Sequence, residues 1–329
     1  MVIFWILGGV AAACAITALF RQATVSAIGA PIVSGALWIV VSGLIAPVSS
    51  SPFRPATTVI IALSSLVVAA LASSAGARPL PSVAIAAMWA ALVSIPVAVV
   101  FLYPVEWGRD PLLWPIDLGG ALVLFVAPGA TAIVLGRSSA PPPAPGIPRA
   151  FGAAIALWIA WAALLVGLEL AVDELTPVIL SSVLIAPSAS LVSFLLVRAL
   201  RTRQVRPMDV ATGVIAGLAA ATPASALIEA PWSAVVGALA GVLAAAVAGR
   251  STAPTTARLM VAALLVPAGV GLVAVGLFET GYGFIFAGQP DSAVRQLVAV
   301  VTVVGFSLFI GLMLRLAVRA IMRRMEGAD

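Results

Sequence analysis

The stretch DLGGALVLFVAPG, residues 117–129, opens on an aspartate and two glycines and then runs without another polar side chain. It contains Phe125 and a Pro-Gly pair at its end. A carboxylate at the head of an apolar run is typical of a helix N-terminus, because its oxygens accept hydrogen bonds from free backbone N–H groups. We therefore interpret Asp117 as the cap of a helix that begins at the surface of a membrane.

The composition supports a membrane protein. Of 329 residues, 63% are hydrophobic and 9% are charged, and the mean hydropathy is +1.21. A soluble domain needs a more polar exterior than this chain can supply, so lipid must surround most of it. The pI near 10.9 comes from arginines spread over short connections, which argues against a nucleic-acid partner because that needs a contiguous basic face.

Two residue types limit the possible chemistry. Cys14 is the single cysteine and histidine is absent, so an intramolecular disulfide, a Cys-rich metal site and an imidazole base are excluded. No acid–base pair lies at membrane depth and no phosphate-binding loop is visible. We expect no enzyme activity, no cofactor and no metal.

Apolar segments of about 20 residues divide the chain into membrane spans. Eleven are predicted: 2–20, 25–47, 57–76, 82–103, 117–136, 150–171, 178–200, 208–229, 232–249, 257–278 and 293–318. We expect one polytopic domain, 1–329, with a first five-helix repeat at 1–136 and a second at 150–278. The proline-rich segment 137–149 is predicted to link them on the cytoplasmic side, and the last helix (293–319) to precede a short cytoplasmic tail at 320–329.

The arginines test this division. With eleven spans, fourteen of the 17 arginines fall on one side, whereas Arg54, Arg109 and Arg295 share the other side with nine of the twelve acids. The positive-inside rule then places the C-terminus in the cytoplasm and the N-terminus outside. The first segment lacks a basic residue before Arg21, so we expect a retained membrane helix rather than a cleaved signal peptide.

Several stretches, in the correct order, resemble the ammonium transporter/Rh family. They are ALFRQATVSAI with ALWIVVSGLIA at 18–46, MWAALVSIPVAVV at 88–100, DLGGALVLFVAPG at 117–129, ALWIAWAALLVG at 156–167, DVATGVIAGLAAATPASALIEAPWSAVVGALAGVLA at 209–244 and GLFETGYGFIFAGQ at 276–289. The resemblance implies an inverted five-helix repeat plus a C-terminal helix, a homotrimer in the plasma membrane, and one pore per subunit. Spacing of the Gly-xxx-Gly type, as at Gly237 and Gly241, also has the plain interpretation of close helix packing.

The resemblance also implies where the family's chemistry would lie. The two pore histidines correspond to Phe125 and Leu264, neither of which takes a proton. The aromatic gate corresponds to Ala62 and Leu164, the serine of the recruitment site to Leu168, and the recruiting tryptophan to a position near Leu102, for which Trp107 is a substitute. Asp117, Gly119 and Gly120 match an architectural motif at the pore vestibule.

The expected outer loops contain aromatic residues and carboxylates that bear on cation recruitment. Phe101, Tyr103, Trp107 and Trp114 could offer an aromatic face to a cation. The carboxylates of the outer loops, Asp110 among them, either concentrate cations or are solvated groups that follow the charge bias of the topology, and we favour the second interpretation.

Two functions follow from these observations. The first is a channel of the ammonium transporter type that passes ammonia, ammonium or another small neutral solute without a histidine relay. The alternative is a non-conducting relative that serves as a scaffold or partner subunit. The short segment after Arg324 argues against control by a signal-transduction protein at the inner mouth.

Overall fold

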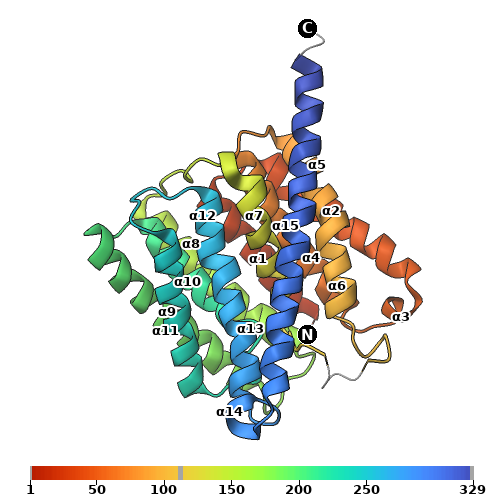
Figure 1. Cartoon of the computed structure of the whole chain (residues 1–329), viewed down its shortest axis with the longest axis vertical. Coiled ribbons are helices and arrows are strands. Elements are labelled where there is room, and N and C mark those ends of the chain that lie inside the picture. The colour runs from red at the N-terminus through yellow and green to blue at the C-terminus, as the bar shows by residue number, and fades with distance from the viewer. Residues whose placement is uncertain (1, 110–113, 327–329) are drawn as a thin grey trace.

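The computed structural model describes residues 2–109 and 114–326. The described chain is a bundle of helices with no strand (Figure 1). Within it, nine helices are long and apolar enough to cross a membrane, and two shorter apolar helices, Leu122–Ser138 and Pro207–Ala221, complete the eleven expected segments. The predicted fold class is therefore confirmed.

The first half of the bundle contains five spans and one short surface helix. Its elements are α1 (Val2–Phe20), α2 (Thr24–Leu44), α3 (Ala46–Ser49), α4 (Arg54–Ser74), α5 (Pro79–Trp89) continued by the π-helical turn η1 (Ala90–Ser94) and α6 (Ile95–Phe101), and the π-helical turn η3 (Leu122–Val126) continued by α7 (Ala127–Leu135) and the short 3₁₀ turn η4 (Gly136–Ser138).

The second half repeats the same order. Its elements are α8 (Ile147–Leu168), α9 (Thr176–Thr202), α10 (Pro207–Ala221), α11 (Ala230–Ala248), and α12 (Thr256–Met260) continued by the π-helical turn η5 (Val261–Leu265) and α13 (Val266–Phe278). After these come α14 (Phe284–Ala287) and the long final helix α15 (Pro290–Glu326).

Packing between helices shows the inverted repeat. In the first half α2 packs on α4 and α5, and in the second half the equivalent α9 packs on α10 and α11. The first helices of the two halves, α1 and α8, pack against each other, and α15 packs on both α7 and α13. Each half has an odd number of spans, so the second half runs through the bundle in the opposite sense to the first.

Small residues allow the closest helix contacts. A Cβ added at Gly271 on α13 would lie 2.1 Å from the carbonyl oxygen of Ala220 on α10, and one at Gly237 on α11 would lie 2.2 Å from that of Ala186 on α9. Only glycine permits such an approach of two backbones. The packing interpretation of the Gly-xxx-Gly spacing is thus confirmed at Gly237.

Three expected boundaries differ from the structure. The fifth span begins its helix only at Leu122, because residues 117–120 form the capping turn. The segment expected at 208–229 is helical only to Ala221, since Pro223 cannot continue the helix and residues 222–227 form turns. The last helix runs on to Glu326, through most of the tail expected at 320–329.

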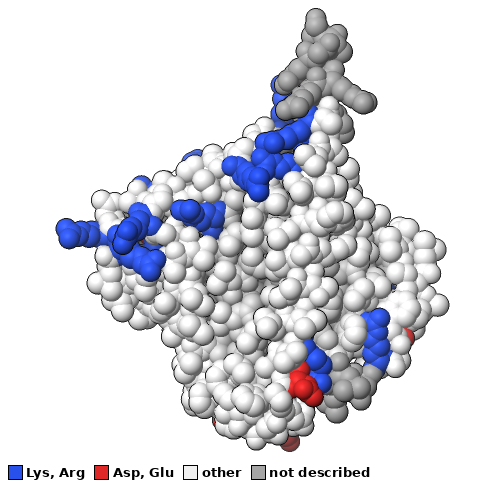
Figure 2. All heavy atoms as spheres, in the orientation of Figure 1, with Lys and Arg blue, Asp and Glu red and all other residues white. Residues whose placement is uncertain are grey.

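The surface has two charged ends and an apolar belt. Figure 2 shows arginines gathered toward the end from which α15 projects and acidic residues at the opposite end. We call these the basic end and the acidic end. Between them, large apolar side chains are exposed, among them Val301 at 62% and Leu184 at 63%, as expected of helices that face lipid.

Candidate functional site

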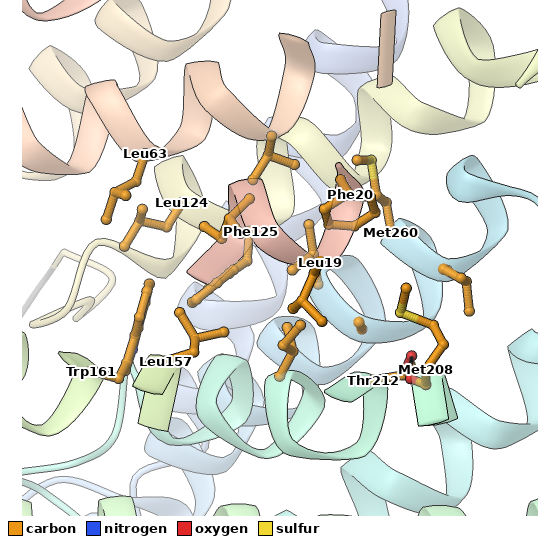
Figure 3. Close-up of a pocket in the computed structure, with 16 residues that line it drawn as sticks. Leu19, Phe20, Leu63, Leu124, Phe125, Leu157, Trp161, Met208, Thr212 and Met260 are labelled. Atoms are coloured by element: carbon orange, nitrogen blue, oxygen red, sulfur yellow. Dashed lines mark hydrogen bonds between the residues drawn. The ribbon is translucent and has the colours of Figure 1, made fainter. Parts of the chain in front are cut away.

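An apolar cavity lies in the centre of the bundle between the two repeats, with a volume of about 60 Å³. Figure 3 shows Leu63, Leu124 and Trp161 toward one end and Met208 and Thr212 toward the other. The lining side chains come from α1, α4, η3, α8, α10, α12 and η5: Ile16, Leu19, Phe20, Leu63, Val67, Leu124, Phe125, Leu157, Trp161, Met208, Thr212, Ile215, Leu259, Met260, Ala263 and Leu264.

Phe125 and Leu264, the positions that the resemblance predicts for the family's histidines, both line this cavity. Phe125 lies on the π-helical turn η3 and Leu264 on η5, which is the equivalent turn of the second repeat. Each residue stands three positions before a proline, Pro128 or Pro267, which occupies the first turn of the following α-helix. π-Helical turns inside α-helices often mark functional sites, and here the pair occupies repeat-related places on the cavity wall.

The polar side-chain groups of Thr212 and Trp161 at the cavity donate their hydrogen bonds to other protein groups. The hydroxyl of Thr212, the one polar side chain in the lining, donates to the carbonyl of Met208 at 2.7 Å. The indole N–H of Trp161 donates to the hydroxyl of Thr222 at 2.9 Å. A water molecule needs two to four polar partners to be held in a buried site. The cavity wall thus offers a dry surface and no side chain that titrates near neutral pH.

Two aromatic rings meet at an angle on the cavity wall. The rings of Phe125 and Trp161 lie with their centroids 5.4 Å apart. The contribution of Trp161 was not anticipated from the sequence, which pointed to Leu164 one turn further along α8. The motif ALWIAWAALLVG does contain this tryptophan, so a buried aromatic on the cavity side of α8 was the available signal.

The expected outer positions lie away from this cavity. Leu164 is fully buried, and its backbone lies against Gly8 of α1. Leu168 is 9% exposed at the end of α8, and Ala62 is half-buried beside the cavity residue Leu63. Neither they nor Leu164 line the central cavity. Their role in an outer gate stays a prediction.

The aromatic residues of the acidic end are already engaged. The indole N–H of the half-exposed Trp107 donates to the carbonyl of Val99 at 3.1 Å. The guanidinium carbon of Arg109 lies over the ring of Trp114, 4.1 Å from its centroid. Tyr103 is fully buried, and its hydroxyl lies 2.6 Å from the hydroxyl of Thr57. In this arrangement Trp114 and Tyr103 offer no free face to a cation.

The motif at residues 117–120 forms the turn that starts the fifth span. The two carboxylate oxygens of Asp117 accept hydrogen bonds from the backbone N–H groups of Ala121 and Leu122, each at 2.7 Å. Gly120 adopts φ +71°, which favours glycine, and a Cβ at Gly119 would lie 2.4 Å from the carbonyl oxygen of Thr222. The capping role predicted for Asp117 is therefore what the geometry shows, whereas a role in a pore vestibule stays a prediction.

Charge at the acidic end lies outside the spans. Partial burial and the neighbouring carboxylate of Asp173 raise the pKa of Glu169, just after α8, above its ordinary value. Asp110, another of the carboxylates expected on this face, lies outside the described residues. No described carboxylate of this end lines the central cavity.

Fold and cavity together define a polytopic helical membrane protein with an inverted five-helix repeat, a closing eleventh helix and a central apolar cavity between the halves. The sequence matches the Ammonium Transporter Family over residues 56–329, and the chain belongs to that family. Homotrimers are typical of it.

Solved structures show the same fold. Mep2 of Saccharomyces cerevisiae aligns with a TM-score of 0.76 at 16% sequence identity, covering 97% of this chain and 85% of its own. Mep2 of Candida albicans aligns with a TM-score of 0.79 at 17% identity, covering 96% and 83%. A protein described as a sensor Amt protein aligns with a TM-score of 0.67 at 17% identity, covering 98% and 95%. Among curated proteins, no sequence matches this chain.

Proposed function

We propose that this protein passes a small neutral solute, with ammonia as the first candidate, through the central cavity and without a histidine proton relay. The observation that carries the proposal is the cavity wall at Phe125 and Leu264. Both positions present apolar side chains to one dry space between the repeats.

The physical argument concerns charge. Placing a cation at the centre of a bilayer costs at least about 2.5–3.5 kcal/mol, and the described wall contains neither a carboxylate nor an imidazole to offset that cost. A neutral molecule escapes this penalty, because it leaves its proton in the aqueous phase. A cavity of about 60 Å³ accommodates a molecule the size of water or ammonia.

The surrounding assembly follows from family membership and charge. We place the protein in the plasma membrane as a homotrimer, with the basic end and the C-terminus in the cytoplasm and the N-terminus outside. Control by a signal-transduction protein at the inner mouth is not part of this proposal.

One observation favours the alternative of a non-conducting scaffold or partner subunit. The rings of Phe125 and Trp161 both line the cavity, with their centroids 5.4 Å apart, and take up part of its space. If these rings never separate, the fold is retained without a passage.

Ammonia-driven alkalinisation inside proteoliposomes separates the two functions. The rate is compared among empty vesicles, the unaltered protein and Phe125→Trp, which enlarges a ring on the cavity wall. Phe309→Trp is the matched control, because Phe309 is 60% exposed on the lipid-facing side of α15. Conduction predicts a rate above empty vesicles that Phe125→Trp abolishes and Phe309→Trp preserves.

A rate equal to that of empty vesicles would refute ammonia conduction and favour the scaffold. Phe125→His then asks whether an imidazole at this position restores transport. A gain of signal would show that the passage persists and lacks only a proton-accepting group.

A further inference from the structure

A second hollow, of about 200 Å³, lies at the basic end against the proline-rich linker between the repeats. We call it the inner chamber. Its walls come from the linker, the start of α10 and the connection from α11 to α12, and consist of Pro141, Pro142, Ala144, Pro145, Arg206, Pro207, Met208, Asp209, Thr252, Ala253, Pro254 and Leu259.

The linker wall is fixed in place by backbone hydrogen bonds. The N–H of Ala140 donates to the carbonyl of Ser74 at 2.9 Å, and the carbonyl of Ala140 accepts from the N–H of Thr256 at 3.0 Å. The hydroxyl of Ser139 accepts from the N–H of Ala257 at 3.1 Å. The segment is therefore tied to α4 and α12 across the basic end, and consecutive prolines stiffen it further.

The opposite wall is held by a buried ion pair. The Nε of Arg198 lies 3.2 Å from the Oδ1 of Asp209, next to Met208. The same guanidinium donates to the carbonyls of Gly249 and Ser251, which fixes the connection between α11 and α12. Hydrogen bonds and the ion pair thus hold the backbone of both walls, so we expect side chains to move more easily than backbone here.

Two side chains belong to the inner chamber and to the central cavity at once. Met208, in the first turn of α10, and Leu259, in α12, line both spaces. Leu259 is 5% exposed. Thr212, one turn deeper on α10, lines the central cavity but not the inner chamber. Figure 3 shows Met208 beside Thr212 at one end of the cavity.

We propose that Met208 and Leu259 form the inner gate of the passage and set the size of the solute that crosses it. This inference rests on the proposed function, because a gate needs a solute. Methionine is unbranched and changes rotamer easily, so Met208 is suited to swing aside while the backbone stays fixed. The gate is apolar, which keeps the barrier to a neutral solute low and that to an ion high.

Thiol accessibility tests the gate without requiring that anything be transported. Cys14 is the single native cysteine and is exposed, so a Cys14→Ser background leaves one reporter, Thr212→Cys, behind the gate. The probe is methyl methanethiosulfonate, a small uncharged reagent added to the proteoliposomes, so that the size of the opening rather than the cost of burying an ion sets its rate. Met208→Cys in the same background measures access to the gate itself.

The proposal predicts fast modification of Met208→Cys and slow modification of Thr212→Cys. Adding Leu259→Ala to Thr212→Cys should raise its rate at least about tenfold, which corresponds to a barrier lowered by about 1.4 kcal/mol. Leu200→Ala, at a side chain 74% exposed on the basic end of α9, is the matched control and should leave the rate unchanged.

The gate is refuted if Thr212→Cys reacts as fast as Met208→Cys, or if Leu259→Ala leaves its rate unchanged. Gel filtration shows whether Leu259→Ala folds. If it does not, Met208→Ala, which shortens the other side chain of the gate, takes its place in the comparison. A gated thiol in a protein that passes no ammonia would reject the proposed solute and retain the gate.

Discussion

Replacing Arg198 with methionine should destabilise the protein more than any other single loss of charge at the basic end. Arg198 is 1% exposed and its Nε lies 3.2 Å from the Oδ1 of Asp209. At that distance and an effective dielectric constant of about 20, the two charges attract by about 5 kcal/mol. Methionine has a similar length and no charge, so Arg198→Met leaves the Asp209 carboxylate buried without its partner.

The expected loss of unfolding free energy is about 3–5 kcal/mol, the usual cost of breaking a buried pair from one side. That is a change of roughly a hundred- to several-thousand-fold in the ratio of folded to unfolded protein. Unfolding is followed by tryptophan fluorescence during an SDS titration in mixed micelles. Arg201→Met is the matched control, because Arg201 lies on the same helix and is exposed.

A second variant shows where the cost arises. Asp209→Asn keeps an acceptor for the backbone N–H of Arg206, which bonds to this side chain at 2.8 Å, and removes the charge. Combined with Arg198→Met it should recover about half of the loss or more, because a buried unpaired charge is the larger part of the penalty. The reasoning is refuted if Arg198→Met costs no more than Arg201→Met, or if Asp209→Asn gives no recovery.

Three further predictions concern packing and capping. Gly271→Ala should lower the melting temperature in detergent, with a loss of about 1–3 kcal/mol of unfolding free energy, because its Cβ would meet backbone. Gly305→Ala is the control, because its Cβ would meet nothing within 4 Å, and equal effects of the two would contradict the packing argument. Asp117→Ala should lower the unfolding free energy by about 1 kcal/mol in the same measurement, and Asp117→Asn should lower it much less. A larger loss for Asp117→Asn than for Asp117→Ala would exclude capping. Thr222→Val should cost about 1–3 kcal/mol, because it leaves the buried indole N–H of Trp161 without a partner. Trp161→Phe should then cost less in the Thr222→Val protein than in the unaltered one, and an equal cost in both would contradict the pairing.

The sequence predicted the architecture well because lipid makes the length and polarity of each segment informative. Asp117 marked a helix start, and the proline-rich linker marked the boundary between the halves. The error at 208–229 falls where apolar residues continue past the end of a helix, and the error at 117–120 arises because the span was counted from its capping residue. Hydropathy alone does not report that backbone hydrogen bonding has stopped there.

The site was harder to predict, because it depends on the rotation of each helix. Phe125 and Leu264 reach one cavity, and counting along the motifs was enough to find them. On α8 the counting pointed to Leu164, whereas Trp161 faces the cavity. The helix α8 is regular from Ile147 to Leu168, so this difference reflects how the whole helix is rotated in the bundle, which hydropathy does not report. Met208 and Leu259 lie far apart in sequence, so only the folded structure shows that they line the same two spaces.

The contacts of α15 bear on how the chain assembles. This helix packs on α7 and on α13, which are the fifth spans of the two repeats. Since α15 follows both repeats in the chain, each half leaves the ribosome before the helix that packs on both is available. The surfaces of α7 and α13 that α15 will cover therefore face lipid, or a chaperone, during synthesis. A ribosome that stops before α15 releases two halves that lack this shared support.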